Sequence, residues 1–215
     1  MKTFFDVDTV RSKKPVLTDN ALVTDRPEKF QTLMVDPPWP YRVGKSQAER
    51  MSTKVDVNWN GRVSSENKYG VMSITQLCAL GSGLPISDNA HLYLWYTNAF
   101  PKEALQIAEA WGFTQKTIIT WVKTNLGDLK PTQGTGYYFP NNTEHMIFCV
   151  KGSLRTSPLA RTMGTTIYAP RAGHSQKPAK AYRFVEDASP GPWLEVFSRT
   201  ERPGWFLYGD QIKSK

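Results

Sequence analysis

The chain has 215 residues, of which 40% are hydrophobic, 12% aromatic and 21% charged, the composition of a folded domain and not of a disordered tail. Lys and Arg number 27 against 19 acids, which gives a net charge of +8 and a pI near 9.5. A basic surplus of this size suits a polyanionic partner. Two separate cysteines and three histidines exclude a disulfide scaffold and a Cys/His zinc site, and we expect no bound metal.

Nothing in the sequence indicates a membrane or secreted protein. No apolar run approaches the roughly 18 residues of a transmembrane helix. At the N-terminus, Asp6 precedes any hydrophobic region, which argues against a signal peptide. The sequence therefore predicts a cytoplasmic protein without a membrane partner.

The apolar pattern predicts strands and helices that alternate along one domain, residues 1–215. Residues 1–30 show no steady period and are expected to form an extended lead-in. The expected strands are residues 32–35, 92–96, 117–122, 144–150, 194–197 and 205–208. This alternation favours an α/β fold with a largely parallel sheet.

Local end signals place three helices between these strands. Ser73-Ile74-Thr75-Gln76 is a capping-box pattern that begins one helix, which ends near Gly81. Pro101 suits the first turn of a second helix, and Gly112 suits its end. A third helix is expected over residues 178–187.

Two polar segments, residues 42–66 and 153–176, are expected to be mobile loops that contact the substrate. Long loops without periodicity are commonly functional. From Lys151 to Arg183 there are seven basic residues and no acid, interleaved with Ser, Thr, Gly and Pro. We favour nucleic-acid contact there over a merely solvated basic face. The arginines expected to contact backbone phosphates are Arg155, Arg161 and Arg171.

Asp36-Pro37-Pro38-Trp39 directly follows the first buried strand. Two prolines fix two φ angles and remove two donors, so we expect the chain to leave the strand stiffly, with its carbonyls free. The acid is then aimed at the carboxyl end of the strand, where α/β proteins bind ligands. A carboxylate, a free carbonyl and an aromatic ring together suit a planar group that bears an NH2. The alternative is a Pro-Pro turn with a tryptophan in the core.

The same tetrapeptide after an N-terminal strand resembles the hallmark of the MT-A70-like adenine N6-methyltransferases. Further segments are similar to motifs of this family, in the same order, from about residue 32 to residue 211. They are Tyr69-Gly70-Val71-Met72-Ser73, Leu94-Trp95-Tyr96-Thr97, Trp121-Val122-Lys123-Thr124-Asn125, Glu144-His145, Val150-Lys151-Gly152, Ser175-Gln176-Lys177-Pro178, Leu194-Glu195-Val196-Phe197-Ser198-Arg199, Gly204-Trp205 and Gly209-Asp210-Gln211. One such tetrapeptide is weak evidence, whereas the ordered set is specific.

The resemblance implies S-adenosylmethionine as cofactor and a Rossmann-like methyltransferase fold in permuted order, with the catalytic strand N-terminal and the cofactor strands C-terminal. It also implies that Lys177 reaches the methionine carboxylate, that Arg199 approaches the ribose, and that Asp210 and Gln211 contact the ribose or the adenine edge. The alternatives are ordinary surface charge for Lys177 and Arg199 and a turn residue for Asp210. Two departures concern the ribose: Thr200-Glu201-Arg202 replaces a His-Asn pair of some members, and Asp210 stands where Asn is common.

These features predict an enzyme that methylates the exocyclic N6 amine of adenine in nucleic acid. Asp36 and the Pro37 carbonyl would accept the hydrogens of the amine, and Pro38 completes the rigid turn. Trp39 or Tyr41 would offer the extruded base a stacking face. The two polar segments would then clamp the strand.

DNA is the expected substrate, because the chain lacks the additional zinc fingers of the family's messenger-RNA members, and RNA is the first alternative. The intact acid at Asp36 argues against a catalytically silent nucleic-acid-binding subunit. Methylation of a protein glutamine is less favoured, since related enzymes for that task carry Asn-Pro-Pro-Tyr. A second copy or a related methyltransferase-like subunit is a further expected partner. His145 is interpreted as a site-lining or structural residue and not a general base, because strand alternation points it away from Glu144.

Overall fold

The computed structural model describes residues 16–18, 27–40, 72–134, 138–171 and 176–209. These residues form one sheet of eight strands, with the order β1-β8-β7-β2-β3-β5-β4-β6. The strands are β1 (Val16–Thr18), β2 (Phe30–Val35), β3 (Ile86–Tyr96), β4 (Thr114–Thr124), β5 (Thr143–Lys151), β6 (Thr166–Pro170), β7 (Trp193–Val196) and β8 (Trp205–Gly209). Six strands point in one direction, while β1 and β5 run against them. The predicted α/β fold with a Rossmann-like, mostly parallel sheet is confirmed.

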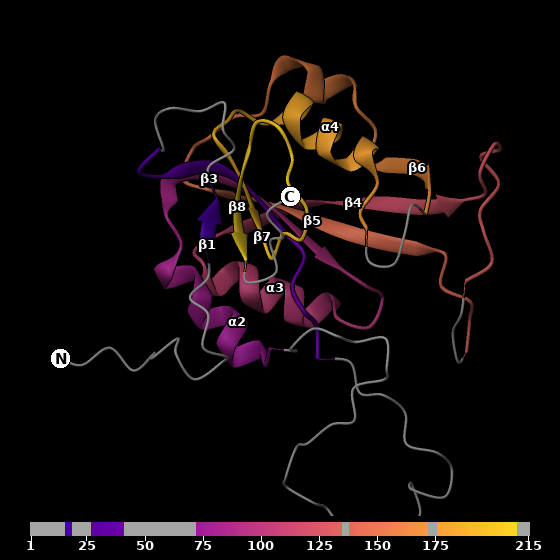
Figure 1. The fold of residues 1–215 in the computed structure, drawn as a ribbon, viewed down its shortest axis with the longest axis horizontal. Coiled ribbons are helices and arrows are strands. Elements are labelled where there is room, and N and C mark those ends of the chain that lie inside the picture. Colours follow the sequence, from indigo (N-terminus) through magenta and orange to yellow (C-terminus); the bar gives the residue numbers. More distant parts are fainter. Residues whose placement is uncertain (1–15, 19–26, 41–71, 135–137, 172–175, 210–215) are drawn as a thin grey trace, which may run out of the picture.

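Helices cover both faces of the sheet (Figure 1). On one face lie α2 (Ile74–Leu80), the short 3-10 helix η2 (Gly81–Gly83) and α3 (Pro101–Ala110), and on the other lie η3 (Pro158–Thr162) and α4 (Ala179–Ala188). Neighbouring residues of β2 therefore enter different cores: Leu33 packs with the α2–α3 side and Met34 with the α4 side. Burial on both faces explains the unbroken apolar run Leu33-Met34-Val35 at the end of this strand.

The predicted helix ends are confirmed. The Ser73 hydroxyl accepts from the Gln76 backbone N–H at 3.2 Å, and the Gln76 side chain accepts from the Ser73 N–H at 2.8 Å. Pro101 opens α3, and Gly112 beyond its end has φ +82°, a conformation that glycine adopts without strain. Among the described residues, no helix is both long enough and apolar enough to cross a membrane.

Two strands of the sheet were not predicted. β1 falls within the expected lead-in and pairs antiparallel with β8, and β6 falls within residues 153–176 and pairs with β4. With η3 and β6, the described residues 153–171 therefore have more fixed structure than the expected mobile loop. Their contact with a substrate stays a prediction, and residues 42–66 lie outside the described part of the chain.

The strands β2 and β7 lie side by side near the middle of the sheet, and their chain connections run to opposite sides. From β2 the chain continues to β3 on one side, whereas from β7 it continues to β8 on the other. The carboxyl ends of the two strands meet where Val35 pairs with Val196. Open α/β sheets bind ligands in the crevice at such a switch point. The turns after β2 and β7 therefore mark the candidate site.

Candidate active site

Asp36 is the first residue beyond β2 and lies at this switch point. Its backbone N–H donates to the Val196 carbonyl at the end of β7, at 3.5 Å. Its side chain is 25% exposed, although the strand before it is buried. The carboxylate thus reaches the carboxyl edge of the sheet, as the sequence predicts.

The carbonyls of the two prolines are not free, which corrects the prediction. The Pro37 carbonyl accepts from the Trp39 N–H at 2.8 Å, and the Pro38 carbonyl accepts from the Met72 N–H at 3.2 Å. Each carbonyl oxygen has two lone pairs, so each retains one for a ligand. The second contact joins the turn to the residue that precedes the capped N-terminus of α2, which fixes the turn from outside.

Trp39 is a core residue. It is 5% exposed, its indole N–H donates to the Trp95 carbonyl at 3.2 Å, and its ring stacks on Phe100 with centroids 5.0 Å apart. A ring so enclosed offers no open face to a base, so the expected stacking role of Trp39 is wrong. The other candidate, Tyr41, lies outside the described residues.

A chain of alternating charges runs from Asp36 across the edge of the sheet. The Lys177 ammonium lies 3.0 Å from Asp36 Oδ1 and 2.9 Å from Glu144 Oε2. The Lys123 ammonium lies 2.7 Å from the other Glu144 oxygen. The network Asp36–Lys177–Glu144–Lys123 joins the turn after β2, the start of α4, β5 and β4. Each of the four side chains in this network is at most one quarter exposed, so water screens their charges weakly.

Burial and charge pull the ionisation of this network in different directions. Burial raises the pKa of Asp36 above its ordinary value, and the Lys177 ammonium offsets part of that rise. Burial also opposes ionisation of Glu144, but the ammoniums of Lys177 and Lys123 outweigh it and lower the pKa of Glu144. Burial disfavours the charged form of Lys177, yet its two carboxylate partners hold its pKa above the ordinary value. Glu144 is thus a firm anion, whereas Asp36 binds a proton more readily than an ordinary aspartate.

Glu144 is a site residue that sequence reasoning missed. It is the second residue of β5, in which Met146, Ile147 and Phe148 are buried. A carboxylate in such a position needs partners, and this was the signal available in the sequence. Alternation did place its neighbour His145 correctly on the opposite face.

His145 has a structural set of contacts. Its ring stacks on Tyr96, with centroids 5.3 Å apart. Nε2 lies 2.7 Å from Asn98 Oδ1 and therefore carries the proton, so that Nδ1 accepts from the Thr120 hydroxyl at 3.0 Å. Both ring nitrogens are engaged, which fits the interpretation that His145 is not a general base.

The turn after β7 lies beside Asp36, because Val196 at the end of β7 accepts from the Asp36 N–H. Phe197 has φ +66°, unusual for a residue with a side chain, and its N–H donates to the Tyr208 carbonyl at 2.7 Å. Such strain commonly accompanies function. Arg199 follows this turn, is half-buried, and its charge lowers the pKa of Asp36. Arg202, within the segment that departs from the family pattern, packs its guanidinium 3.4 Å from the centre of the Tyr182 ring.

The structure describes two of the four predicted cofactor-binding residues. It brings Lys177 and Arg199 to the crevice beside Asp36, while Asp210 and Gln211 lie outside the described residues. Lys177 uses two of its three N–H bonds on protein carboxylates, which leaves one for a ligand. Its predicted contact with a methionine carboxylate stays a prediction.

The three predicted phosphate-binding arginines do not share one surface. Arg171 directly follows β6, whose carboxyl end is at the same edge of the sheet as Asp36. Arg155 follows the carboxyl end of β5, the antiparallel strand, and therefore lies towards the opposite edge. Arg161 lies in η3, which Ser157 ties to the C-terminal end of α4.

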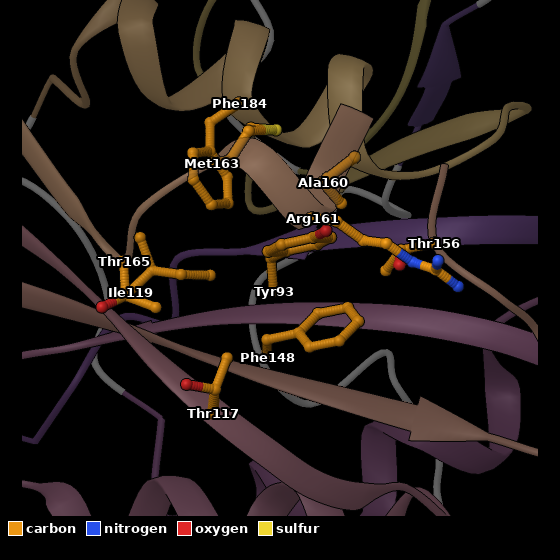
Figure 2. A pocket seen from close by; sticks show the side chains of 11 residues that line it. Tyr93, Thr117, Ile119, Phe148, Thr156, Ala160, Arg161, Met163, Thr165 and Phe184 are labelled. Carbon is orange, nitrogen blue, oxygen red and sulfur yellow. The ribbon is translucent and has the colours of Figure 1, made fainter. Parts of the chain in front are cut away.

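Arg161 instead lines a cavity of about 180 Å³ on the α4 face of the sheet (Figure 2). Other lining residues are mostly apolar, among them Tyr93, Ile119, Phe148 and Phe184. This cavity does not include any member of the charge network. Among the described residues, no group of His, Cys, Asp and Glu is arranged to hold a metal ion.

A Rossmann-like sheet with an acid-Pro-Pro-Trp turn at its switch point defines the class of the protein as an α/β methyltransferase. The profile of the MT-A70 family matches residues 30–211, nearly all of the described chain. The protein belongs to the MT-A70 family.

Similar proteins differ in how much of their length this chain covers. The type II methyltransferase M.MunI of Mycoplasma sp is 27% identical over 191 residues, 86% of this chain and 78% of its own. The N(6)-adenosine-methyltransferase catalytic subunit METTL3 of Homo sapiens is 28% identical over 192 residues, 86% of this chain but 28% of its own. The N6-adenosine-methyltransferase non-catalytic subunit MTB of Arabidopsis thaliana is 26% identical over 132 residues, 60% of this chain and 15% of its own. The chain thus spans most of M.MunI and little more than a quarter of METTL3.

Proposed function

We propose that this protein transfers a methyl group from S-adenosylmethionine to the exocyclic N6 amine of adenine in nucleic acid, with DNA as the substrate. The observation that carries the proposal is the position of Asp36, a partly exposed carboxylate at the switch point of a methyltransferase sheet. The name of METTL3, an N(6)-adenosine-methyltransferase, supports adenine N6 chemistry, and M.MunI, a type II methyltransferase, is similar to this chain along most of its length. A cytoplasmic location is part of the same proposal.

The cations beside Asp36 suit the carboxylate of S-adenosylmethionine. Lys177 has one unused N–H and Arg199 is cationic, so these two residues would hold a carboxylate, while the strained turn at Phe197 brings backbone close to the crevice. When bound, the cofactor supplies an electrophilic methyl group on a sulfonium. Asp210 and Gln211 would complete the ribose and adenine contacts.

Asp36 is the residue of this protein that would act on the adenine amine. The lone pair of an adenine amine is delocalised into the ring, so the amine is a poor nucleophile until its hydrogens are held. The Asp36 carboxylate would accept one hydrogen, and the remaining lone pair of the Pro37 carbonyl would accept the other. Positive charge that develops on the nitrogen is stabilised by the carboxylate, which then takes the proton. Lys177 fixes the orientation of that carboxylate.

The test is an assay with labelled S-adenosylmethionine and matched DNA and RNA oligonucleotides, followed by nucleoside analysis. We expect label in N6-methyldeoxyadenosine, and none with the Asp36→Ala variant. Label in RNA alone would overturn the choice of DNA. Label in neither nucleic acid but in glutamine of a protein extract would overturn the substrate class, and cofactor binding without any transfer would indicate a silent subunit.

We further propose that the connection between β4 and β5 binds a second copy of this chain. Its residues 125–142 contain one acid and one base, so this segment is neutral in a chain of charge +8 and does not repel a like copy. Large apolar side chains there are between 64% and 90% exposed: Leu126, Leu129, Tyr138 and Phe139. The connection projects from one end of the sheet (Figure 1). Light scattering should give a dimer that Leu126→Ser with Phe139→Ser converts to monomer; a monomeric wild type would point to a related subunit as partner instead.

A further inference from the structure

Two tryptophan rings lie against the two lysines of the charge network. Trp95, near the end of β3, is 1% exposed, and the Lys177 ammonium lies 5.1 Å from the centre of its ring. Trp121, on β4, is 2% exposed, and the Lys123 ammonium lies 5.4 Å from its ring centre. The two rings meet edge to face, with centroids 6.2 Å apart and planes at 80°. Each ammonium that contacts Glu144 therefore also lies over an indole.

The face of an indole attracts a cation, and the attraction is stronger where water is excluded. Lys177 is held from two sides in this way: its carboxylate partners take two N–H bonds, and the Trp95 ring faces the same ammonium. A lysine side chain has four rotatable carbons and would otherwise adopt many orientations. The ring restricts the ammonium to the position between Asp36 and Glu144.

Trp95 also connects directly to the catalytic turn. Its carbonyl accepts from the Trp39 indole N–H at 3.2 Å. Thus the backbone of Trp95 holds the turn that carries Asp36, and its side chain holds the cation that orients Asp36. One residue fixes both halves of the Asp36–Lys177 pair.

A hydrogen bond of the indole N–H does not explain why position 95 is a tryptophan. Nε1 is buried and finds no acceptor among the described residues. Trp121, in contrast, donates to the Ala169 carbonyl at 2.8 Å. An unpaired buried donor lowers stability, so the presence of tryptophan at position 95 requires another reason. The face that it presents to Lys177 supplies one.

We propose that Trp95 is a positioning residue for methyl transfer, acting through Lys177. It holds the ammonium between Asp36 and Glu144, so that the Asp36 carboxylate meets the amine in one orientation. It does not touch the substrate. Its effect on methyl transfer rests on the function proposed above, whereas its effect on Lys177 does not.

The variants Trp95→Phe and Trp95→Leu separate the ring face from simple bulk. Phenylalanine keeps a ring and removes the unpaired N–H, so kcat should fall by a few-fold. Leucine removes the ring, and kcat should fall by roughly ten- to thirtyfold, with KM for nucleic acid unchanged. In a Lys177→Met background, Trp95→Leu should cause little further loss, because its effect passes through the missing ammonium.

Trp205 supplies the matched control, because it is also 1% exposed and lies outside the charge network. Trp205→Leu should lower stability, and its effects should add to those of Lys177→Met. Additive effects of Trp95→Leu and Lys177→Met would overturn the proposal and make Trp95 a core residue like any other. If the leucine variant does not fold, the same cycle with Trp95→Phe decides the matter.

A second measurement needs no substrate. In ¹⁵N-labelled protein, the Lys177 ammonium should give a slowly exchanging resonance, assigned by its absence in Lys177→Met. We expect this resonance to persist in Trp95→Phe and to broaden or vanish in Trp95→Leu. An unchanged resonance in the leucine variant would refute the positioning role even if methyl transfer occurs as proposed. A resonance that behaves as expected in a protein without transferase activity would refute the proposed function alone.

Discussion

Three residues that are far from Asp36 in the sequence set the surroundings of its carboxylate. Val196 holds its backbone, Lys177 binds its oxygen, and the charge of Arg199 acts on its ionisation. Burial works against these cations and favours the neutral acid. A carboxylate with a raised pKa binds a proton more readily than an ordinary one, which suits a group that accepts a proton during a reaction.

Asp36→Asn should reduce single-turnover methyl transfer by about a hundred- to a thousandfold. The amide nearly keeps the shape of the carboxylate and can still accept a hydrogen bond, but it carries no charge as the amine nitrogen becomes cationic. Cofactor and nucleic-acid affinities should change little. Asp88→Asn is the control, since Asp88 is exposed and far from the switch point. A rate within a few-fold of wild type would mean that the turn acts by shape alone.

Glu144→Gln should destabilise the fold by roughly 3 kcal/mol near neutral pH, because it leaves Lys123 without its carboxylate partner and Lys177 with one instead of two. The pKa of Glu144 is lowered from 4.5, so its contribution is present above pH 4.5 and is lost as the pH falls through the lowered value. The pKa of Lys177 is raised from 10.5, so the contribution is lost again only as the pH rises beyond 10.5.

Urea unfolding of wild type and Glu144→Gln across this pH range measures the difference directly. Asp36 has a raised pKa and so changes stability in the opposite sense in acid. The charge of Glu144 contributes to that rise, so the difference between the two proteins also contains the coupling of the two carboxylates. A stability difference that stays constant from pH 7 down to pH 2 would show that the carboxylate charge of Glu144 does not matter.

At the scale of elements, the Asp36-Pro37-Pro38-Trp39 turn depends on a helix that was predicted from its cap. Met72 donates to the Pro38 carbonyl, and the next residue, Ser73, is the N-cap of α2. The helix has seven residues, too short to be stable alone, so its cap and its packing against α3 matter. The turn after β2 is therefore held by an element that lies more than thirty residues further along the sequence.

Ser73→Ala should cost about 1 kcal/mol, because it removes the acceptor for the Gln76 N–H. For a chain of this length, the melting temperature should fall by about 2–4 °C. Ser82→Ala is the matched control: Ser82 is an exposed serine that donates to a carbonyl near the C-terminal end of the same helix, so its loss should change stability by less than about 0.5 kcal/mol. Equal effects of the two substitutions would show that the capping box does not stabilise α2.

At the scale of the whole molecule, the sheet decides which charges can act together. Arg171 shares an edge with Asp36, whereas Arg155 lies towards the opposite edge. A nucleic-acid strand whose base enters at Asp36 must cross the first edge. The basic surplus of the sequence is thus divided between a region that can meet such a strand and one that cannot.

Arg171→Ala should weaken nucleic-acid binding at all sequences alike and reduce the slope of log affinity against log salt by about one. Arg155→Ala, which removes an equal charge from an exposed arginine, should leave that slope nearly unchanged. Binding titrations at several salt concentrations check both. Equal losses in the two variants would place the strand on both edges of the sheet, and a loss confined to one sequence would mean that Arg171 reads a base.

Features that depend on local spacing could be predicted from the sequence alone. The apolar runs predicted the central strands, the Ser73–Gln76 cap and Pro101 predicted helix starts, and alternation set His145 apart from Glu144. The Asp36 turn and the ordered motifs predicted the class of methyltransferase. Each of these features is carried by residues close together in the chain or by motifs in a fixed order.

Tertiary structure decided which distant groups meet. The pairing of β7 with β2 placed Val196 beside Asp36, and the packing of α4 placed Lys177 between two carboxylates and over Trp95. It also enclosed Trp39 and used the proline carbonyls, against expectation. Burial and electrostatic pairing depend on distances through space, and strand order sets those distances, because neighbours in a sheet need not be neighbours in the chain.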